Sequence, residues 1–190
     1  MRCFGAVVAL LVTLPFATAD CIPWPKPQTC TPSKSGCAFW PCLESVAHCG
    51  PNGYPAGYIN PVCESLQAKL PQFTRAGRRW IADMGYCIME AQVPASQCQT
   101  SCEDILAVGW TSHIECFLKT GFCTLPGNDL KIFMQTLGLD LTVSDTILDL
   151  ASSTLQECVA AFKNGTIHGG WVEWVVKTLN GGSSGYATLG

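Results

Sequence analysis

Cysteine offers the most chemistry in this sequence, which holds 13 cysteines among 190 residues. Cysteine thiolates bind zinc, and Cys98 and Cys102 are separated by an interval that zinc ligands use. The sequence has no second pair or histidine at finger spacing that would complete such a site, and it has no C-x-x-C redox motif. The pattern therefore predicts disulfides, and we expect no metal ion and no other cofactor.

Histidine is the next residue type with catalytic potential, and the sequence has His48, His113 and His168. A phospholipase A2 site needs a helical His-Asp pair beside paired cysteines and a glycine-rich calcium loop, and the sequence lacks both. The acid nearest His113 is Glu115, and a residue two positions along a helix points to another face. The H-E-x-x-H and P-loop motifs are also missing. We therefore expect no enzyme, and we interpret His113 as a structural or surface histidine.

The first residues predict secretion. Arg2 precedes the apolar run from Cys3 to Phe16, and small residues then form a cleavage site, so we interpret residues 1–19 as a signal peptide. The alternative is an uncleaved anchor, but a membrane span needs about 20 continuous apolar residues. No later segment reaches that length, so we expect no membrane span. Removal of the leader takes away Cys3 and leaves an even number of cysteines, which suits full pairing in an oxidising compartment. The sequence thus predicts a secreted, extracellular protein.

The charge of the chain excludes one class of partner. Its net charge of −3 provides no basic field, so we expect no nucleic-acid partner. Only 13% of the residues are charged, which favours a packed core over a disordered secreted chain.

The elements that must position the cysteines are mostly helical. Residues 20–36 form a proline-rich arm without regular structure. From residue 37 to residue 163 we expect one helical domain, because apolar residues recur there at intervals of three and four. The glycine-rich residues 164–190 form a flexible C-terminal tail. The predicted fold class is all-α, a disulfide-stapled helical bundle.

Breaks in the pattern divide this domain. Residues 43–60 are rich in glycine, proline and asparagine, and we expect mostly loop there after one short helical turn. Pro71 interrupts the first amphipathic segment, Val93-Pro94 ends the second, and Gly127-Asn128-Asp129 provides a break and a cap. The last long helix starts at a capping box, Thr142–Asp145, and stops at Asn164-Gly165. The other predicted helices cover residues 62–70, 73–92, 100–108, 111–122, 128–137 and 171–179.

A motif at the start of the helical domain resembles a known family. Residues 36–44 read G-C-A-F-W-P-C-L-E and are similar to the opening motif of the stanniocalcins, G-C-x-A-F-x-C-L-E. The segment Gly77–Ile81 is similar to the family's G-K-x-F-V helix. Four cysteine intervals also agree with the family: Cys37 to Cys42, Cys63 to Cys87, Cys116 to Cys123, and Cys123 to Cys158. The resemblance covers about residues 30–163.

The resemblance implies a disulfide pattern. Cys21 and Cys98 are additional to this pattern. We expect them to pair with each other, and the alternative is that Cys21 links two chains. The family's late cysteine, which links a covalent dimer, has no counterpart up to Gly190. A homodimer is therefore possible, but without that covalent link. The pairs that the resemblance implies are Cys30–Cys42, Cys37–Cys63, Cys49–Cys102, Cys87–Cys116 and Cys123–Cys158.

Three surface features suggest modification or binding. Asn164-Gly165-Thr166 is an N-glycosylation sequon just after a helix end. Arg75, Arg78 and Arg79 share a helix face and could contact heparan sulfate or an acidic partner, although a plain solvated face is the simpler interpretation. Trp171 and Trp174 either dock on the core, which is our default, or anchor a partner.

The resemblance implies a function without turnover. Stanniocalcins are hormone-like secreted glycoproteins associated with calcium and phosphate regulation and with restraint of secreted metalloproteases. We therefore expect a regulator that binds an extracellular receptor or a target protease through a protein surface. The alternative is a gland, venom or reproductive-tract protein that uses the same scaffold for a different receptor or for a small lipid.

Overall fold

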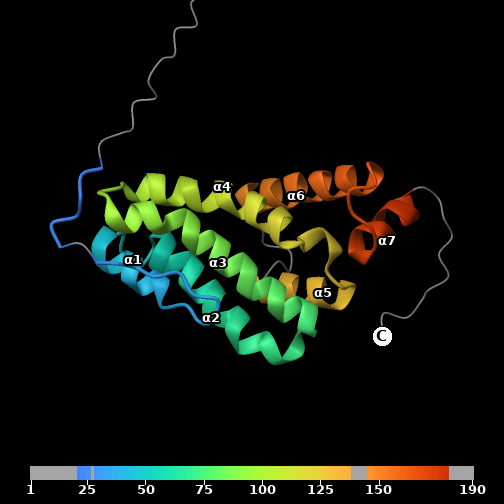
Figure 1. Cartoon of the computed structure of the whole chain (residues 1–190), viewed down its shortest axis with the longest axis horizontal. Helices are drawn as coiled ribbons and strands as arrows, with labels where there is room; N and C mark the ends of the chain where they lie inside the picture. The colour runs from blue at the N-terminus through green and yellow to red at the C-terminus, as the bar shows by residue number, and fades with distance from the viewer. Residues whose placement is uncertain (1–20, 27, 138–144, 180–190) are drawn as a thin grey trace, which may run out of the picture.

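The computed structural model of the chain describes residues 21–26, 28–137 and 145–179. In this part of the chain every regular element is a helix (Figure 1), and the one strand-like pairing is a bridge between Pro23 and Cys98. The all-α fold is therefore confirmed. The α-helices are α1 (Phe39–Ala47), α2 (Asn60–Lys69), α3 (Arg75–Gln97), α4 (Cys102–Thr120), α5 (Gly127–Thr136), α6 (Asp145–Lys163) and α7 (Gly170–Leu179).

Helix α3 runs through the middle of the bundle (Figure 1). It packs along α4 on one side and against α1 on another. Helices α4 and α6 follow one another along one edge of the molecule, while α2 and α5 lie beside each other at the opposite edge. Helix α7 closes the end, where it packs against the short 3₁₀ turn η3 (Phe122–Thr124).

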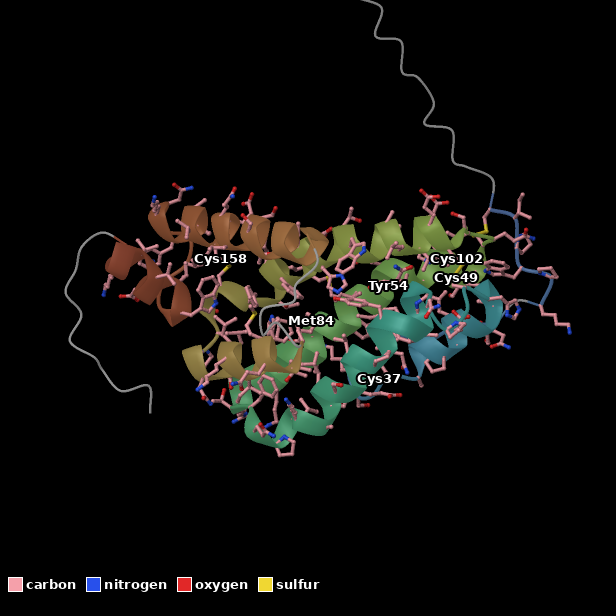
Figure 2. All side chains as sticks on the ribbon, turned by 180° about the vertical axis from the view of Figure 1, so that it is seen from behind. Cys37, Cys49, Tyr54, Met84, Cys102 and Cys158 are labelled. Atoms are coloured by element: carbon pink, nitrogen blue, oxygen red, sulfur yellow. A yellow bond between two sulfur atoms is a disulfide. The ribbon has the colours of Figure 1, made fainter. Side chains whose placement is uncertain are left out.

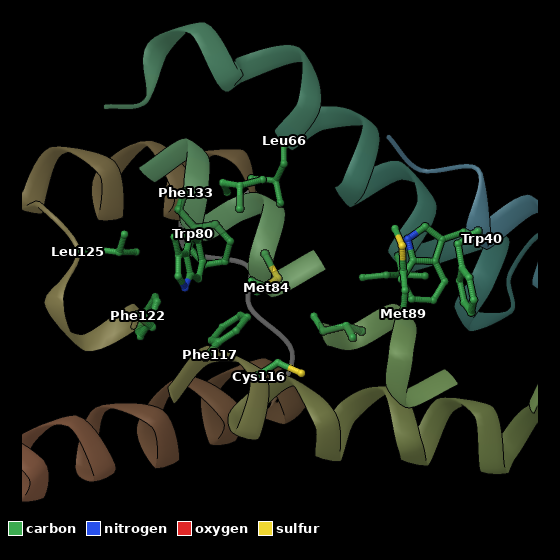
Figure 3. Packing of buried hydrophobic residues seen from close by; sticks show 14 of the residues in the cluster. Trp40, Leu66, Trp80, Met84, Met89, Cys116, Phe117, Phe122, Leu125 and Phe133 are labelled. Carbon is green, nitrogen blue, oxygen red and sulfur yellow. The ribbon is translucent and has the colours of Figure 1, made fainter. Parts of the chain in front are cut away.

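The core forms where the apolar face of α3 meets its neighbours (Figure 3). The Trp80 ring packs edge-on against Phe133 of α5 at 4.9 Å between ring centroids, and against Phe117 of α4 at 5.6 Å. The face predicted from the periodicity is the face that is buried, since Trp80, Met84 and Ile88 are at most 5% exposed. Burial of a side chain of this size contributes roughly 1.5–3 kcal/mol.

Helix α3 is longer than the sequence predicts. An end at Val93-Pro94 is wrong, because the helix continues through Pro94 to Gln97. Pro94 lacks the N–H that would bond the carbonyl of Glu90, but Glu90 is exposed, so water can satisfy that carbonyl. The Cys98 N–H still donates to the Pro94 carbonyl at 2.9 Å, which closes the last turn.

The segment expected as loop is partly helical. Residues after α1 fold into a π-helical turn, η1 (Tyr54–Ile59), that leads into α2. Burial explains the difference, because Tyr54 is 4% exposed and Ile59 5% exposed. Gly57 permits the turn, since a Cβ on Gly57 would lie 2.5 Å from the carbonyl oxygen of Pro51.

The two helices expected on either side of Gly109 are one helix, α4. Its start agrees with the sequence, since the Ser101 hydroxyl accepts from the Asp104 N–H at 3.0 Å. Gly109 does not break the helix, because the Tyr54 ring packs directly against it and stabilises the helical conformation from outside. A local preference for a break is therefore overridden by a tertiary contact.

In the C-terminal third, the end of α6 agrees with the sequence, whereas the expected flexible tail does not. The α6 helix ends at Lys163, and Gly165 follows in the left-handed region at φ +71°. The capping box predicted at Thr142–Asp145 begins outside the described residues. The residues expected as a flexible tail, 164–190, include α7, which packs on the domain because Val172 is fully buried. Residues 180–190 of that tail lie outside the described residues.

Six disulfides cross-link this bundle, with Cα–Cα distances of 5.2 to 5.9 Å. Five are the pairs implied by the resemblance. The sixth joins Cys21 to Cys98 within the chain, and it attaches the proline-rich arm to the end of α3. Trp24 strengthens this attachment, since its indole N–H donates to the Ala95 carbonyl at 2.9 Å. Figure 2 shows Cys49 and Cys102, the partners of another disulfide, close together. The pairs are Cys21–Cys98, Cys30–Cys42, Cys37–Cys63, Cys49–Cys102, Cys87–Cys116 and Cys123–Cys158.

Candidate functional site

The cysteines contribute no free thiol in the part of the chain that the structure describes, because each of them forms a disulfide. Among the same residues no group of three or more histidine, cysteine, aspartate or glutamate side chains is placed to hold a metal ion. No helix within residues 21–26, 28–137 and 145–179 is both long and apolar enough to cross a bilayer.

The predicted arginine cluster lies exposed at the start of α3. Arg78 donates through Nη1 to the Phe73 carbonyl at 2.6 Å, so it caps the turn before its own helix. Arg79 lies 3.5 Å from the carboxylate of Asp83, which also accepts from Lys34 at 2.6 Å. The bond from Lys34 is the main cause of the lowered pKa of Asp83. Arg78 and Arg79 thus already form polar contacts within the chain, and Arg75 lies exposed beside them.

A buried carboxylate lies under this cluster. Asp129 of α5 is fully buried, and its carboxylate accepts from the Thr74 N–H at 2.9 Å and from the Thr74 hydroxyl at 2.5 Å. Thr74 in turn caps α3 by accepting from the Gly77 N–H at 3.2 Å. From the sequence Asp129 was expected at the break and cap before the 128–137 helix, but its carboxylate holds the cap of α3. No local signal reveals this contact, because 55 residues separate the partners.

The first of the two predicted tryptophans is docked. Trp171 is 9% exposed, and its indole N–H donates to the Phe122 carbonyl at 2.9 Å. Gly170 allows the close approach, since a Cβ there would lie 2.6 Å from the backbone of Thr124. Docking, the default expectation, is therefore confirmed for Trp171, which does not present its ring as an anchor. The side chain of Trp174 lies outside the described residues.

The sequon residue Asn164 is exposed immediately after α6. Its N–H donates to the Ala160 carbonyl at 2.9 Å, so the backbone is fixed while the side chain faces solvent. The position is accessible to a glycosyltransferase, and occupancy of the site remains a prediction.

The bundle also contains an apolar cavity, partly open to solvent, that the sequence did not predict. Its volume is about 290 Å³, and α2, α3, α4, α5 and α6 all contribute to its wall. Apart from Met1, every methionine of the chain, namely Met84, Met89 and Met134, lines it. Methionine adapts its shape to irregular spaces and is over-used at binding surfaces that accept varied partners. Figure 3 shows Met84 and Met89 in the core between α3 and its neighbours.

Among the described residues, the polar side chains that line this cavity are Ser33, Lys34, Tyr58, Gln67, His113 and Thr154. Lys34, whose ammonium group is held by Asp83, lies at the rim near Ser33 and Gly36. His113 lies in the wall and is 6% exposed. Its Nδ1 contacts the Gly109 carbonyl at 2.5 Å.

The protonation state of His113 follows from that contact. A carbonyl only accepts, so Nδ1 carries the proton and Nε2 is left as an acceptor. Burial is the main reason why the pKa of His113 is lowered, and the bond to the Gly109 carbonyl opposes it. The neutral ring therefore offers a hydrogen-bond acceptor in a wall that is otherwise mostly apolar.

Aromatic rings support His113 from behind. Trp110 lies 5.6 Å from its ring and 5.0 Å from the ring of Tyr58, which also lines the cavity. Tyr54 meets His113 edge-on at 6.4 Å, and burial raises the pKa of the Tyr54 phenol. These contacts fix the orientation of the imidazole. The sequence placed these aromatic residues on separate segments, one of them an expected loop, so it gave no signal for their meeting.

Comparisons of this chain with protein-family models, with curated proteins and with solved structures gave no match.

Proposed function

We propose that this chain is a secreted regulatory protein of the stanniocalcin type, which acts by binding an extracellular protein and not by turnover. The observation that carries the proposal is the disulfide network, which contains the five pairs that the resemblance implies. A scaffold stapled in this way holds its surface in one conformation, which reduces the entropy lost when a partner binds. Regulation by binding needs that property, whereas it needs no catalytic group.

The basic surface of Arg75, Arg78 and Arg79 is the contact that we propose for such a partner. It projects from the start of α3, and the buried Asp129 carboxylate fixes the helix end beneath it. Guanidinium groups form paired hydrogen bonds with carboxylates, so an acidic segment of the partner fits this surface.

The test uses the full chain secreted from eukaryotic cells with its disulfides intact. We expect it to enter the medium without residues 1–19 and to bind and inhibit a secreted metalloprotease. Charge reversal at Arg75→Glu with Arg79→Glu should weaken this binding by at least about tenfold, because it replaces two attractions with two repulsions. The matched control is Lys163→Glu with Lys177→Glu, which changes the net charge by the same amount at exposed residues of α6 and α7.

Three results would count against this proposal. Retention of the chain inside the cell would remove the secreted role. Equal binding by the charge-reversed variant and the control would exclude the arginine surface as the contact. Absence of binding across a panel of secreted metalloproteases and receptors would exclude the regulatory function.

A second candidate function is favoured by a different observation. The apolar cavity supports a carrier of a small lipid-like molecule, as in a gland or reproductive-tract secretion that uses this scaffold. Mass spectrometry of the native secreted protein tests this, since a carrier should release a stoichiometric small molecule on denaturation. A protein that releases nothing and binds no apolar probe would exclude the carrier.

A further inference from the structure

We infer that the cavity is a binding site for a small neutral molecule that is apolar over most of its surface and carries one hydroxyl group, which donates to Nε2 of His113. The inference deepens the second function proposed above and is independent of the protein-binding function. It concerns the wall and the size of the cavity, and the acceptor atom Nε2 of His113.

The size of the cavity sets the size of the ligand. An apolar cavity of about 150 Å³ stays dry and binds benzene, which has six non-hydrogen atoms. The cavity of this chain is about 290 Å³, so it suits a molecule of about twelve non-hydrogen atoms at the same density. A cavity walled by Ile88, Phe117, Phe133 and the three methionines gains little from water, and an apolar ligand restores the missing contacts.

The state of His113 sets the polarity of the ligand. With Nδ1–H bonded to the Gly109 carbonyl, the neutral ring accepts at Nε2 and has no second proton to donate. A hydroxyl group satisfies this acceptor, whereas a carboxylate presents a second acceptor and an uncompensated charge in an apolar wall. Lys34 does not reverse this preference, because it lies at the rim and already forms an ion pair with Asp83 at 2.6 Å.

Gly85 marks a point where the cavity can be filled by mutation. It belongs to α3 and lines the cavity, and a Cβ built on it meets no other atom within 4 Å. A leucine at this position therefore has space to occupy, and it replaces a residue that weakens a helix. Gly85→Leu should keep the fold and compete with the ligand for space, while Gly85→Ala adds a single methyl group and leaves most of the volume.

The test uses the full secreted chain with methyl-¹³C methionine, because the signals of Met84, Met89 and Met134 all report on the cavity wall. The probes are 4-pentylphenol, which has a hydroxyl group and twelve non-hydrogen atoms, pentylbenzene, which lacks the hydroxyl, and 4-propylbenzoic acid, which also has twelve non-hydrogen atoms and is a carboxylate at pH 7.5. We expect saturable shifts with 4-pentylphenol, and binding of the acid weaker by about tenfold or more, since its charge must be desolvated.

Two variants locate the interaction. His113→Phe should weaken binding of 4-pentylphenol about three- to tenfold, the value of one hydrogen bond, and change the affinity for pentylbenzene less than about twofold. Gly85→Leu should remove binding of both probes, and Gly85→Ala should retain it. Thermal unfolding of each variant confirms that it is folded.

The outcomes separate the ligand class from the carrier function. Equal affinity for all three probes, or a hydroxyl preference that survives His113→Phe, would overturn the ligand class proposed here and leave an apolar carrier. Absence of methionine shifts with every probe would overturn both this inference and the carrier function. Unchanged binding by a folded Gly85→Leu variant would show that the probes bind elsewhere, and it would overturn the assignment to this cavity.

Discussion

Asp129 ties α5 to the start of α3, and replacing it tests how much a buried polar contact contributes to this fold. Helix α5 contains no cysteine, so it is held to the bundle by packing and by this carboxylate. The carboxylate accepts two hydrogen bonds from Thr74 and is fully buried. Hydrogen bonds to a charged group are worth about 1.5–3 kcal/mol each. Two such bonds amount to about 3–6 kcal/mol, so Asp129→Ala should lower the free energy of unfolding by at least about 3 kcal/mol.

The assay is urea unfolding of the oxidised protein, followed by far-ultraviolet circular dichroism and by tryptophan fluorescence. Trp80 is a suitable probe, because its ring packs on Phe133 of α5 at 4.9 Å. In Asp129→Ala, a loss of about 3 kcal/mol should lower the melting temperature by roughly 6–12 °C for a domain of this size. Asp129→Asn keeps one acceptor oxygen, so it should cost only about 1 kcal/mol.

Gly77 provides a sharper form of this test. A Cβ on Gly77 would lie 2.5 Å from a carboxylate oxygen of Asp129. Gly77→Ala should therefore destabilise the wild-type protein by about 1–3 kcal/mol. In the Asp129→Ala background the same change should be neutral or stabilising, because the oxygen is gone and alanine favours the helix. A cost below about 1 kcal/mol for Asp129→Ala, or an equal cost of Gly77→Ala in both backgrounds, would refute this account.

Three further predictions rest on single sites. The pKa of His113 is lower in the folded state than in the unfolded state, so protonation of His113 favours unfolding. The free energy of unfolding should therefore be unaffected by His113 above its unfolded pKa of about 6.5, and it should fall as the pH decreases below that value. Urea unfolding across pH 4.5–8 measures how the free energy of unfolding depends on pH. His113→Phe should reduce this dependence, and a free energy of unfolding that does not change with pH would contradict the prediction. Gly109→Ala should destabilise by about 1–3 kcal/mol because the Tyr54 ring occupies the position of the new methyl group, whereas Gly85→Ala in open space should stabilise by up to about 1 kcal/mol; equal effects in thermal unfolding would show that the ring moves freely. Asn164→Gln should reduce the mass of the secreted protein by the mass of one glycan, the same loss that an endoglycosidase causes in the wild type. If neither treatment changes the mass, the sequon is not glycosylated.

Local signals in the sequence were sufficient where one element determines its own structure. The apolar interval of three and four residues identified the buried face of α3, because a helix repeats its faces with that period. The helix start expected at residue 100 lies close to the observed cap of α4 at Ser101, and Gly165 marked the stop of α6, since caps act on backbone groups of the adjacent turn. The positions of the cysteines predicted a stapled bundle, and pairing needed a family pattern because spacing alone allows many schemes.

Contacts between distant segments were decided only by the tertiary structure. The sequence predicts a helix end at Pro94 and a gap between the helices 100–108 and 111–122, yet Pro94 and Gly109 lie inside helices, because packing and hydrogen bonds outweigh local preferences of about 1–3 kcal/mol. The Asp129–Thr74 contact and the cavity at His113 join segments tens of residues apart. The sequence by itself determined the helical class, the disulfide chemistry and the stop after α6. Which faces met, and what space was left between them, depended on how side chains from separate helices fit together.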